Sequence, residues 1–100
     1  MKKLFVALLI LSIVACGEKS ATEYIAAAKV SITQQKNDTA IIELKNAIKA
    51  DPKQVEARFL LGQLYFDLHQ YENAAKELER AIKYKHPKID TLPLLARAYQ

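Results

Sequence analysis

The sequence has few of several residue types, and these shortages limit what the chain can be. Its single cysteine allows no intramolecular disulfide, and tryptophan is absent. With two glycines and three prolines, the chain has no glycine-rich phosphate loop and no nucleophile elbow. Alanine, leucine, lysine and glutamate dominate instead, and this composition favours helices throughout. An all-α fold is therefore expected.

The length allows one small domain. At 100 residues, about half of them hydrophobic, the chain can bury a core near the lower end of what folds unaided. Such a chain has little room for a catalytic cleft.

The start of the sequence, over 1–15, has the pattern of an export signal. Lys2 and Lys3 form a positive start, and the apolar run 4–14 is too short to span the ~30 Å hydrocarbon core of a bilayer as a helix. The ending "IVAC" resembles the lipobox of bacterial lipoprotein signals. That resemblance implies cleavage before Cys16, lipidation of its thiol and a membrane-anchored chain. The alternative is a generic secretory signal with an incidental cysteine.

Two features of the remaining chain bear on location and partners. Gly17 follows the cysteine, where an aspartate in this signal family often retains a lipoprotein at the inner membrane, so we expect the outer membrane, facing the periplasm. Loss of Lys2 and Lys3 leaves only a slight excess of basic over acidic side chains. A charge of about +2, evenly spread, gives no reason to expect nucleic-acid binding.

The sequence repeats with a period of about 34 residues, and small residues keep the register best. The shift aligns Ala28 with Gly62 and Ala96, and Leu44 with Leu78. It also aligns two further pairs of alanines: Ala40 with Ala74, and Ala47 with Ala81.

This pattern resembles the tetratricopeptide repeat. The second unit carries it most fully, with Leu61 and Gly62, then Tyr65 and Tyr71, then Ala74, Leu78 and Ala81, and Pro87 at the end. In the first unit Ser31 departs from the usual aromatic residue. The resemblance implies antiparallel helical hairpins stacked as a solenoid. We expect a signal peptide over 1–15, a lipidated tether over 16–20, repeats over 21–54 and 55–88, and the first helix of a truncated third repeat over 89–100.

Gly62 stands inside a predicted helix, where glycine costs about 1 kcal/mol relative to alanine. A glycine tolerated by chance is the alternative to a packing role. Since helices approach closely only where facing residues are small, we expect Gly62 to lie against Ala74 of the next helix. The residues expected to pack the repeats together are Ala28, Ala40, Ala47, Gly62, Tyr65, Ala74, Ala81 and Ala96.

We expect helices over about 21–35, 39–50, 54–68, 72–85 and from 91 onward. Asp90 is expected to cap the last helix, with Pro93 in its first turn. His69 and His86 are far apart in the sequence and have no partners at metal-ligand spacing, so we expect turn residues and no metal site. Glu72, Glu77 and Glu79 alternate with basic residues in the manner of a solvated face. The sequence thus predicts no enzyme, no cofactor and no small-molecule substrate.

The function that these observations leave open is the binding of a protein partner through the shape of the surface. In tetratricopeptide arrays the first helices of successive hairpins line a groove that holds a partner peptide or helix. Carried over to this chain, the groove residues are Ile25, Lys29, Ile32, Phe59, Gln63, Phe66, Asp67 and Arg97. Phe59 and Phe66 are candidate anchors, since aromatic side chains concentrate binding energy. The alternative is that both are ordinary core residues.

A closer resemblance covers the lipobox together with "ELKNAIKADP", "EARFLLGQLYFDLHQYENAAKELERAI" and "LPLLARAYQ". It is to the N-terminal end of tetratricopeptide lipoproteins found with exosortase (PEP-CTERM) and exopolysaccharide systems of Gram-negative bacteria. It implies a membrane-tethered scaffold for protein partners in the periplasm, serving exopolysaccharide export or surface-protein sorting. The alternative is the anchor end of a longer envelope enzyme or polymer-modifying protein.

Overall fold

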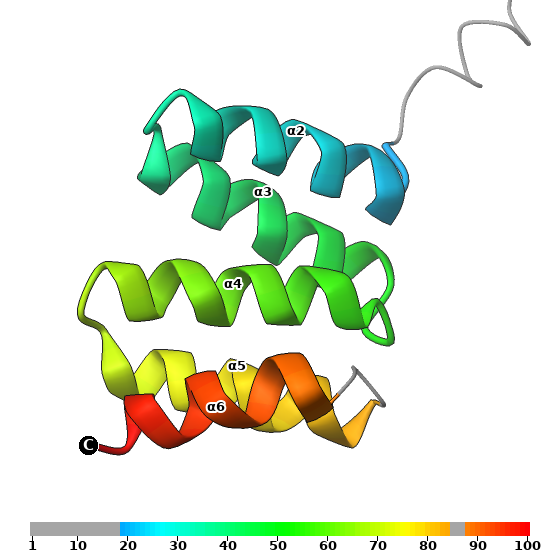
Figure 1. Ribbon diagram of the computed structural model, residues 1–100. Coiled ribbons are helices and arrows are strands. Elements are labelled where there is room, and N and C mark those ends of the chain that lie inside the picture. The colour runs from blue at the N-terminus through cyan, green and yellow to red at the C-terminus, as the bar shows by residue number, and fades with distance from the viewer. Residues whose placement is uncertain (1–18, 85–87) are drawn as a thin grey trace, which may run out of the picture.

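The computed structural model describes residues 19–84 and 88–100 (Figure 1). The predicted signal peptide and Cys16 lie outside the described residues. Within those two ranges the structure has five α-helices and no strand. The helices are α2 (Ala21–Thr33), α3 (Asn37–Ala50), α4 (Val55–Asp67), α5 (Tyr71–Lys83) and α6 (Lys88–Ala98). The all-α prediction is confirmed for the described part of the chain.

Consecutive helices pack against one another as antiparallel neighbours. Helices α2 and α3 form one hairpin and α4 and α5 a second, with α3 packed on α4 and α6 on α5 (Figure 1). Helix α4 also contacts α6, two positions later in the chain. This arrangement agrees with a repeat solenoid.

Both hairpins turn in the same way. The N–H of Lys36 donates to the Ser31 carbonyl at 2.9 Å, and the N–H of Gln35 donates to the Ile32 carbonyl at 3.0 Å. This pair of bonds is a Schellman motif, and Gln35 takes its left-handed position with φ of 58°. His69, at the matching position of the second hairpin, has φ of 61° and the equivalent bonds. The repeat thus extends to the backbone of the turns.

The second helices supply a regular row of small and branched residues to the core. Ala40, Leu44 and Ala47 of α3 are each 0% exposed. Ala74, Leu78 and Ala81 of α5 occupy the same spacing and are also 0% exposed. Since alanine adds only one carbon beyond the backbone, these faces let the first helix of each hairpin approach closely.

Gly62 lies at this close approach, but its nearest neighbour differs from the expected one. A Cβ added at Gly62 would lie 2.8 Å from both Cγ and Cδ2 of Leu78, and 3.4 Å from the carbonyl oxygen of Ala74. The Leu78 side chain therefore occupies most of the space that a side chain at position 62 would need. The Ala74 methyl is not among the three nearest atoms.

Helix α6 departs from the prediction in two respects. It begins at Lys88 and not near Thr91, so Asp90 lies within the helix and Pro93 lies inside it, beyond the first turn. Ala96, expected to pack like Ala28 and Gly62, is exposed. The physical reason is that Gly62 is covered by the second helix of its own hairpin, and α6 has no such helix in the described part of the chain. Thr91 and Ala98 are the residues of α6 that are buried in the interior.

Candidate partner-binding surface

The first helices of the repeats are joined to one another by side-chain contacts on one face. Lys29 of α2 forms an ion pair with Glu56 of α4 at 2.6 Å, with both side chains about half exposed. The Arg97 guanidinium of α6 lies over the Phe66 ring of α4, 4.9 Å from its centroid. Helices α2, α4 and α6 therefore form a continuous surface, called here the first-helix face.

The residues predicted for a groove divide into three groups on this face. Lys29, Gln63, Asp67 and Arg97 are exposed. Ile32, Phe59 and Phe66 are half-buried, and Ile32 and Phe66 pack against the core. Ile25 is 4% exposed and belongs to the core. The expectation for Ile25 is corrected accordingly, because a buried side chain offers no surface to a partner.

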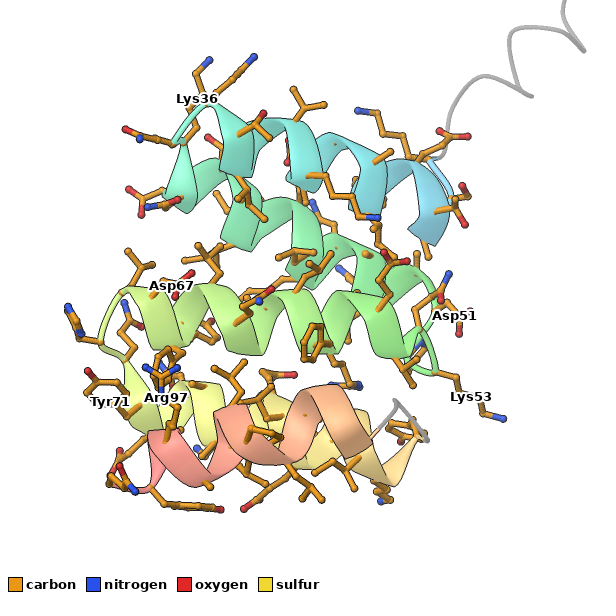
Figure 2. All side chains as sticks on the ribbon, viewed as in Figure 1. Lys36, Asp51, Lys53, Asp67, Tyr71 and Arg97 are labelled. Carbon is orange, nitrogen blue, oxygen red and sulfur yellow. The ribbon has the colours of Figure 1, made fainter. Side chains whose placement is uncertain are left out.

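Phe66 is the centre of an aromatic and cationic cluster. Its ring contacts Arg97 on one element and Tyr71 on another, where the ring centroids lie 5.5 Å apart in an edge-on arrangement. Tyr71 in turn meets His69 edge-on at 5.8 Å, and its hydroxyl is hydrogen-bonded to Nδ1 of His69 at 2.7 Å. Arg97, Asp67 and Tyr71 lie toward the same end of the molecule in Figure 2.

This cluster offers a partner several kinds of contact at once. Tyr71 is 42% exposed, so part of its ring faces solvent. Arg97 presents a planar cation that can pair with a carboxylate, and Gln63 and Asp67 add polar groups on the same helix as Phe66. Rigid aromatic rings beside arginine are typical of residues that dominate binding energy at interfaces. Phe59 is half-buried as well, and it too is engaged in an interaction within the chain.

The residues predicted to pack the repeats all lie in the interior except Ala96. Tyr65 is 8% exposed, and the buried small residues are Ala28, Ala40, Ala47, Gly62, Ala74 and Ala81. Ser31, which stands where the second repeat has Tyr65, donates from its hydroxyl to Oε2 of Glu43 at 2.9 Å. This bond accounts for a buried serine in an apolar position of α2.

Arg58 is a structural residue that the sequence pattern did not identify. It is 8% exposed, and its Nε donates to the Pro52 carbonyl at 3.2 Å. Its Nη1 pairs with Oε2 of Glu77 on α5 at 3.3 Å, and its guanidinium lies 5.5 Å from the centroid of the Tyr84 ring. Glu77 also pairs with Arg80. The signal was present: the repeat aligns Arg58 with Tyr24 and Leu92, so a cation falls in an otherwise apolar position.

Other kinds of site find no support in the described residues. Residues 19–84 and 88–100 contain no group of three or more histidine, cysteine or acidic side chains that could hold a metal ion. A shallow, open depression is lined by Gln70, Tyr71, Glu72 and Asn73. No helix in the described part of the chain has the length and apolar character needed to cross a bilayer.

A family model described as tetratricopeptide repeat matches residues 31–98, about two thirds of the chain. The match includes the turns of both hairpins and the whole of α3, α4, α5 and α6. No curated protein matches the sequence. The repeats of this family are typically scaffolds that bind protein partners and have no catalytic role of their own.

Proposed function

The chain belongs to the tetratricopeptide repeat family, and from this premise we propose that it is a membrane-tethered scaffold that holds protein partners in the bacterial periplasm. The partner lies on the first-helix face, as a peptide or a helix that crosses α4. The observation that carries the proposal is the half-buried Phe66 ring, which lies between two exposed side chains, Arg97 and Tyr71.

The tether is proposed from the sequence. Cys16 follows a short apolar run and the residues Ile13, Val14 and Ala15. Lipidation of this cysteine explains an unpaired thiol in an exported chain. Two or three acyl chains hold a protein on a bilayer, whereas one gives only marginal binding. The resemblance to exosortase-linked lipoproteins supports a role in exopolysaccharide export or surface-protein sorting, at the outer membrane.

Site-specific cross-linking in cells tests the binding surface. A photoreactive amino acid replaces Gln63, which is exposed on α4, and in a matched variant it replaces Lys45, which is exposed on α3. We expect discrete cross-linked partners from position 63 and none from position 45. Equal products from both positions, or none from position 63, would contradict binding at the first-helix face.

The tether has its own test. The wild-type chain and a Cys16→Ser variant are compared by membrane fractionation and mass spectrometry. We expect an acyl mass on the wild type and its loss, with release from the membrane fraction, in the serine variant. A wild type without an acyl mass would show that the cysteine is incidental.

A further inference from the structure

The two loop edges of the solenoid differ in charge. One edge holds the start of α2, the α3–α4 turn and the end of α5, because antiparallel helices place these points together. Lys19, Lys49, Lys53 and Lys83 lie there and are all exposed. These four lysines are called the basic edge. Figure 2 shows Lys53 at this end of the molecule and Lys36, Asp67 and Arg97 at the other.

The acidic residues do not neutralise the basic edge. The exposed acidic side chains near it are Glu23, Asp51 and Glu79, three against the four lysines, and the Asp51 carboxylate accepts a hydrogen bond from the N–H of Lys53 at 3.1 Å. Glu56 is occupied by its ion pair with Lys29. Within the described residues, none of the four lysines forms an ion pair.

Two of the four lysines lie over aromatic rings. The Nζ of Lys19 is 5.9 Å from the centroid of the Tyr24 ring, and that of Lys83 is 5.8 Å from the centroid of the Tyr84 ring. A neutral ring leaves the charge of an exposed ammonium group in place. All four cations can therefore attract an external anion.

The opposite edge has the reverse balance. Its charged residues are Lys36, Asp38, Asp67, Glu72 and Arg97, so acidic side chains outnumber basic ones. The charge of the molecule thus changes along its helix axes, from the basic edge to the opposite edge.

The basic edge is also the edge closest to the proposed anchor. Lys19 is three residues after Cys16, and three extended residues span at most about 11 Å. This reach is close to the Debye length of about 8 Å at physiological ionic strength, within which charges attract anionic lipid. Lys19 therefore lies near the headgroups whenever the anchor is in the bilayer, and the other three lysines of this edge can reach them when the edge turns toward the membrane.

We infer that the basic edge docks on anionic lipid headgroups and so holds the solenoid with its helix axes pointing away from the membrane. The inference rests on the proposed tether, and it adds an orientation that the tether alone does not impose. Docking directs the opposite edge, with Asp67 and the Phe66 cluster, toward the periplasm. A partner can then reach the first-helix face without displacing lipid.

Helix electrostatics alone does not account for the four lysines. Lys49 and Lys83 lie in the last turns of α3 and α5, where a cation stabilises the helix dipole. Lys19 and Lys53 lie outside the helices and have no such role. The pair Lys19 and Lys53 is therefore the pair to substitute, since their loss removes surface charge without removing a charge from a helix terminus.

The test uses the full chain bound to lipid vesicles. A fluorophore is attached at Ala50→Cys, on the basic edge, or at Gln34→Cys, on the opposite edge, and is quenched by nitroxide-labelled headgroups. The vesicles are phosphatidylcholine alone or phosphatidylcholine mixed with phosphatidylglycerol. We expect stronger quenching at position 50 in the anionic vesicles, no such increase at position 34, and loss of the difference in high salt.

Charge substitutions give the expected size of the effect. The ratio of docked to undocked protein should fall about fivefold for each lysine removed, and so about 25-fold for Lys19→Gln with Lys53→Gln. The matched control, Lys36→Gln with Lys76→Gln, removes the same charge away from the basic edge and should leave the ratio unchanged. Thermal melts of both double variants should agree with the wild type.

The outcomes separate this inference from the tether. Binding to the vesicles is checked by flotation. If the protein floats with both kinds of vesicle but quenching at position 50 is the same in both, the docking is overturned and the tether is left intact. An equal fall in the ratio of docked to undocked protein in the two double variants overturns the docking as well, because it reveals a general effect of net charge. Protein that floats with neither kind of vesicle overturns both.

Discussion

The side chain of Leu78 on α5 occupies the space beside Gly62 on α4, since a Cβ at position 62 would lie 2.8 Å from two carbons of the leucine. The first hairpin has Ala28 and Leu44 at the equivalent positions, both 0% exposed. One methyl can therefore be accommodated there when the leucine adjusts. The two hairpins thus place a small residue and a leucine at equivalent positions.

Substitution of Gly62 tests this packing. Gly62→Leu should lower the free energy of unfolding by about 1–3 kcal/mol or more, because overpacking forces Leu78 and the helices apart. Gly62→Ala should have a small net effect, since it gains helix propensity worth up to about 1 kcal/mol while Leu78 must shift. Thermal and urea unfolding followed by circular dichroism measure both. A leucine variant as stable as the alanine variant would contradict close approach at this position.

The buried cation provides a second prediction. Arg58→Ala should destabilise the fold by about 3 kcal/mol, because it removes the buried one of the two arginines paired with the Glu77 carboxylate and the donor to the Pro52 carbonyl. Arg80→Ala serves as the control, since its bond to Glu77 is at the surface, where an ion pair contributes less than about 1 kcal/mol. Urea unfolding of the two variants should rank them clearly. Similar losses would mean that Glu77 relies on neither arginine in particular.

The turns offer a stabilising substitution. Gln35 has a positive φ, and a left-handed conformation costs a residue with a Cβ about 1–2 kcal/mol. Gln35→Gly should therefore raise stability by up to about 1 kcal/mol, the rest being offset by the greater freedom of glycine in the unfolded chain. Gln34→Gly, one residue earlier and at negative φ, should give no gain. A melting temperature lowered by Gln35→Gly would show that the glutamine side chain itself supports the turn.

Small residues at fixed spacing made most of the fold predictable. The pairs Ala40 with Leu44 and Ala74 with Leu78 are local patterns within a helix, and the recurrence of the first as the second indicated stacked hairpins. The start of α6 was not predictable in this way. Asp90 and Pro93 favour a helix that begins between them, whereas the helix of the structure includes both.

The candidate surface was less predictable than the fold. Ile25 and Ala28 lie three residues apart on one side of α2 and both are buried, so periodicity alone did not show that the core extends as far as Ile25. The pairing of Arg58 with Glu77 joins two different helices, and so does that of Arg97 with Phe66. Contacts of this kind depend on tertiary packing, and no local pattern encodes them.

The last prediction separates an anchoring role of Phe66 from a structural one. Phe66→Ala should weaken partner capture by about 1–3 kcal/mol while most of the helical signal remains, because its half-buried ring contributes to a binding cluster. If the ring is mainly core, the same truncation should lower the free energy of unfolding by about 3–5 kcal/mol, and capture would fall with folding. Cross-linking yield from position 63 and unfolding curves, measured on the same variants, distinguish these results.

Arg97→Gln is the companion variant to Phe66→Ala. It removes the cation over the ring, which contributes about 0.5–1 kcal/mol at an exposed site, and retains the phenylalanine itself. Reduced capture in Arg97→Gln with an unchanged melt would show that a partner recognises the assembled cluster. Unchanged capture in a well-folded Phe66→Ala variant would remove this part of α4 from the binding surface, because the ring at the centre of the cluster would then contribute nothing to recognition.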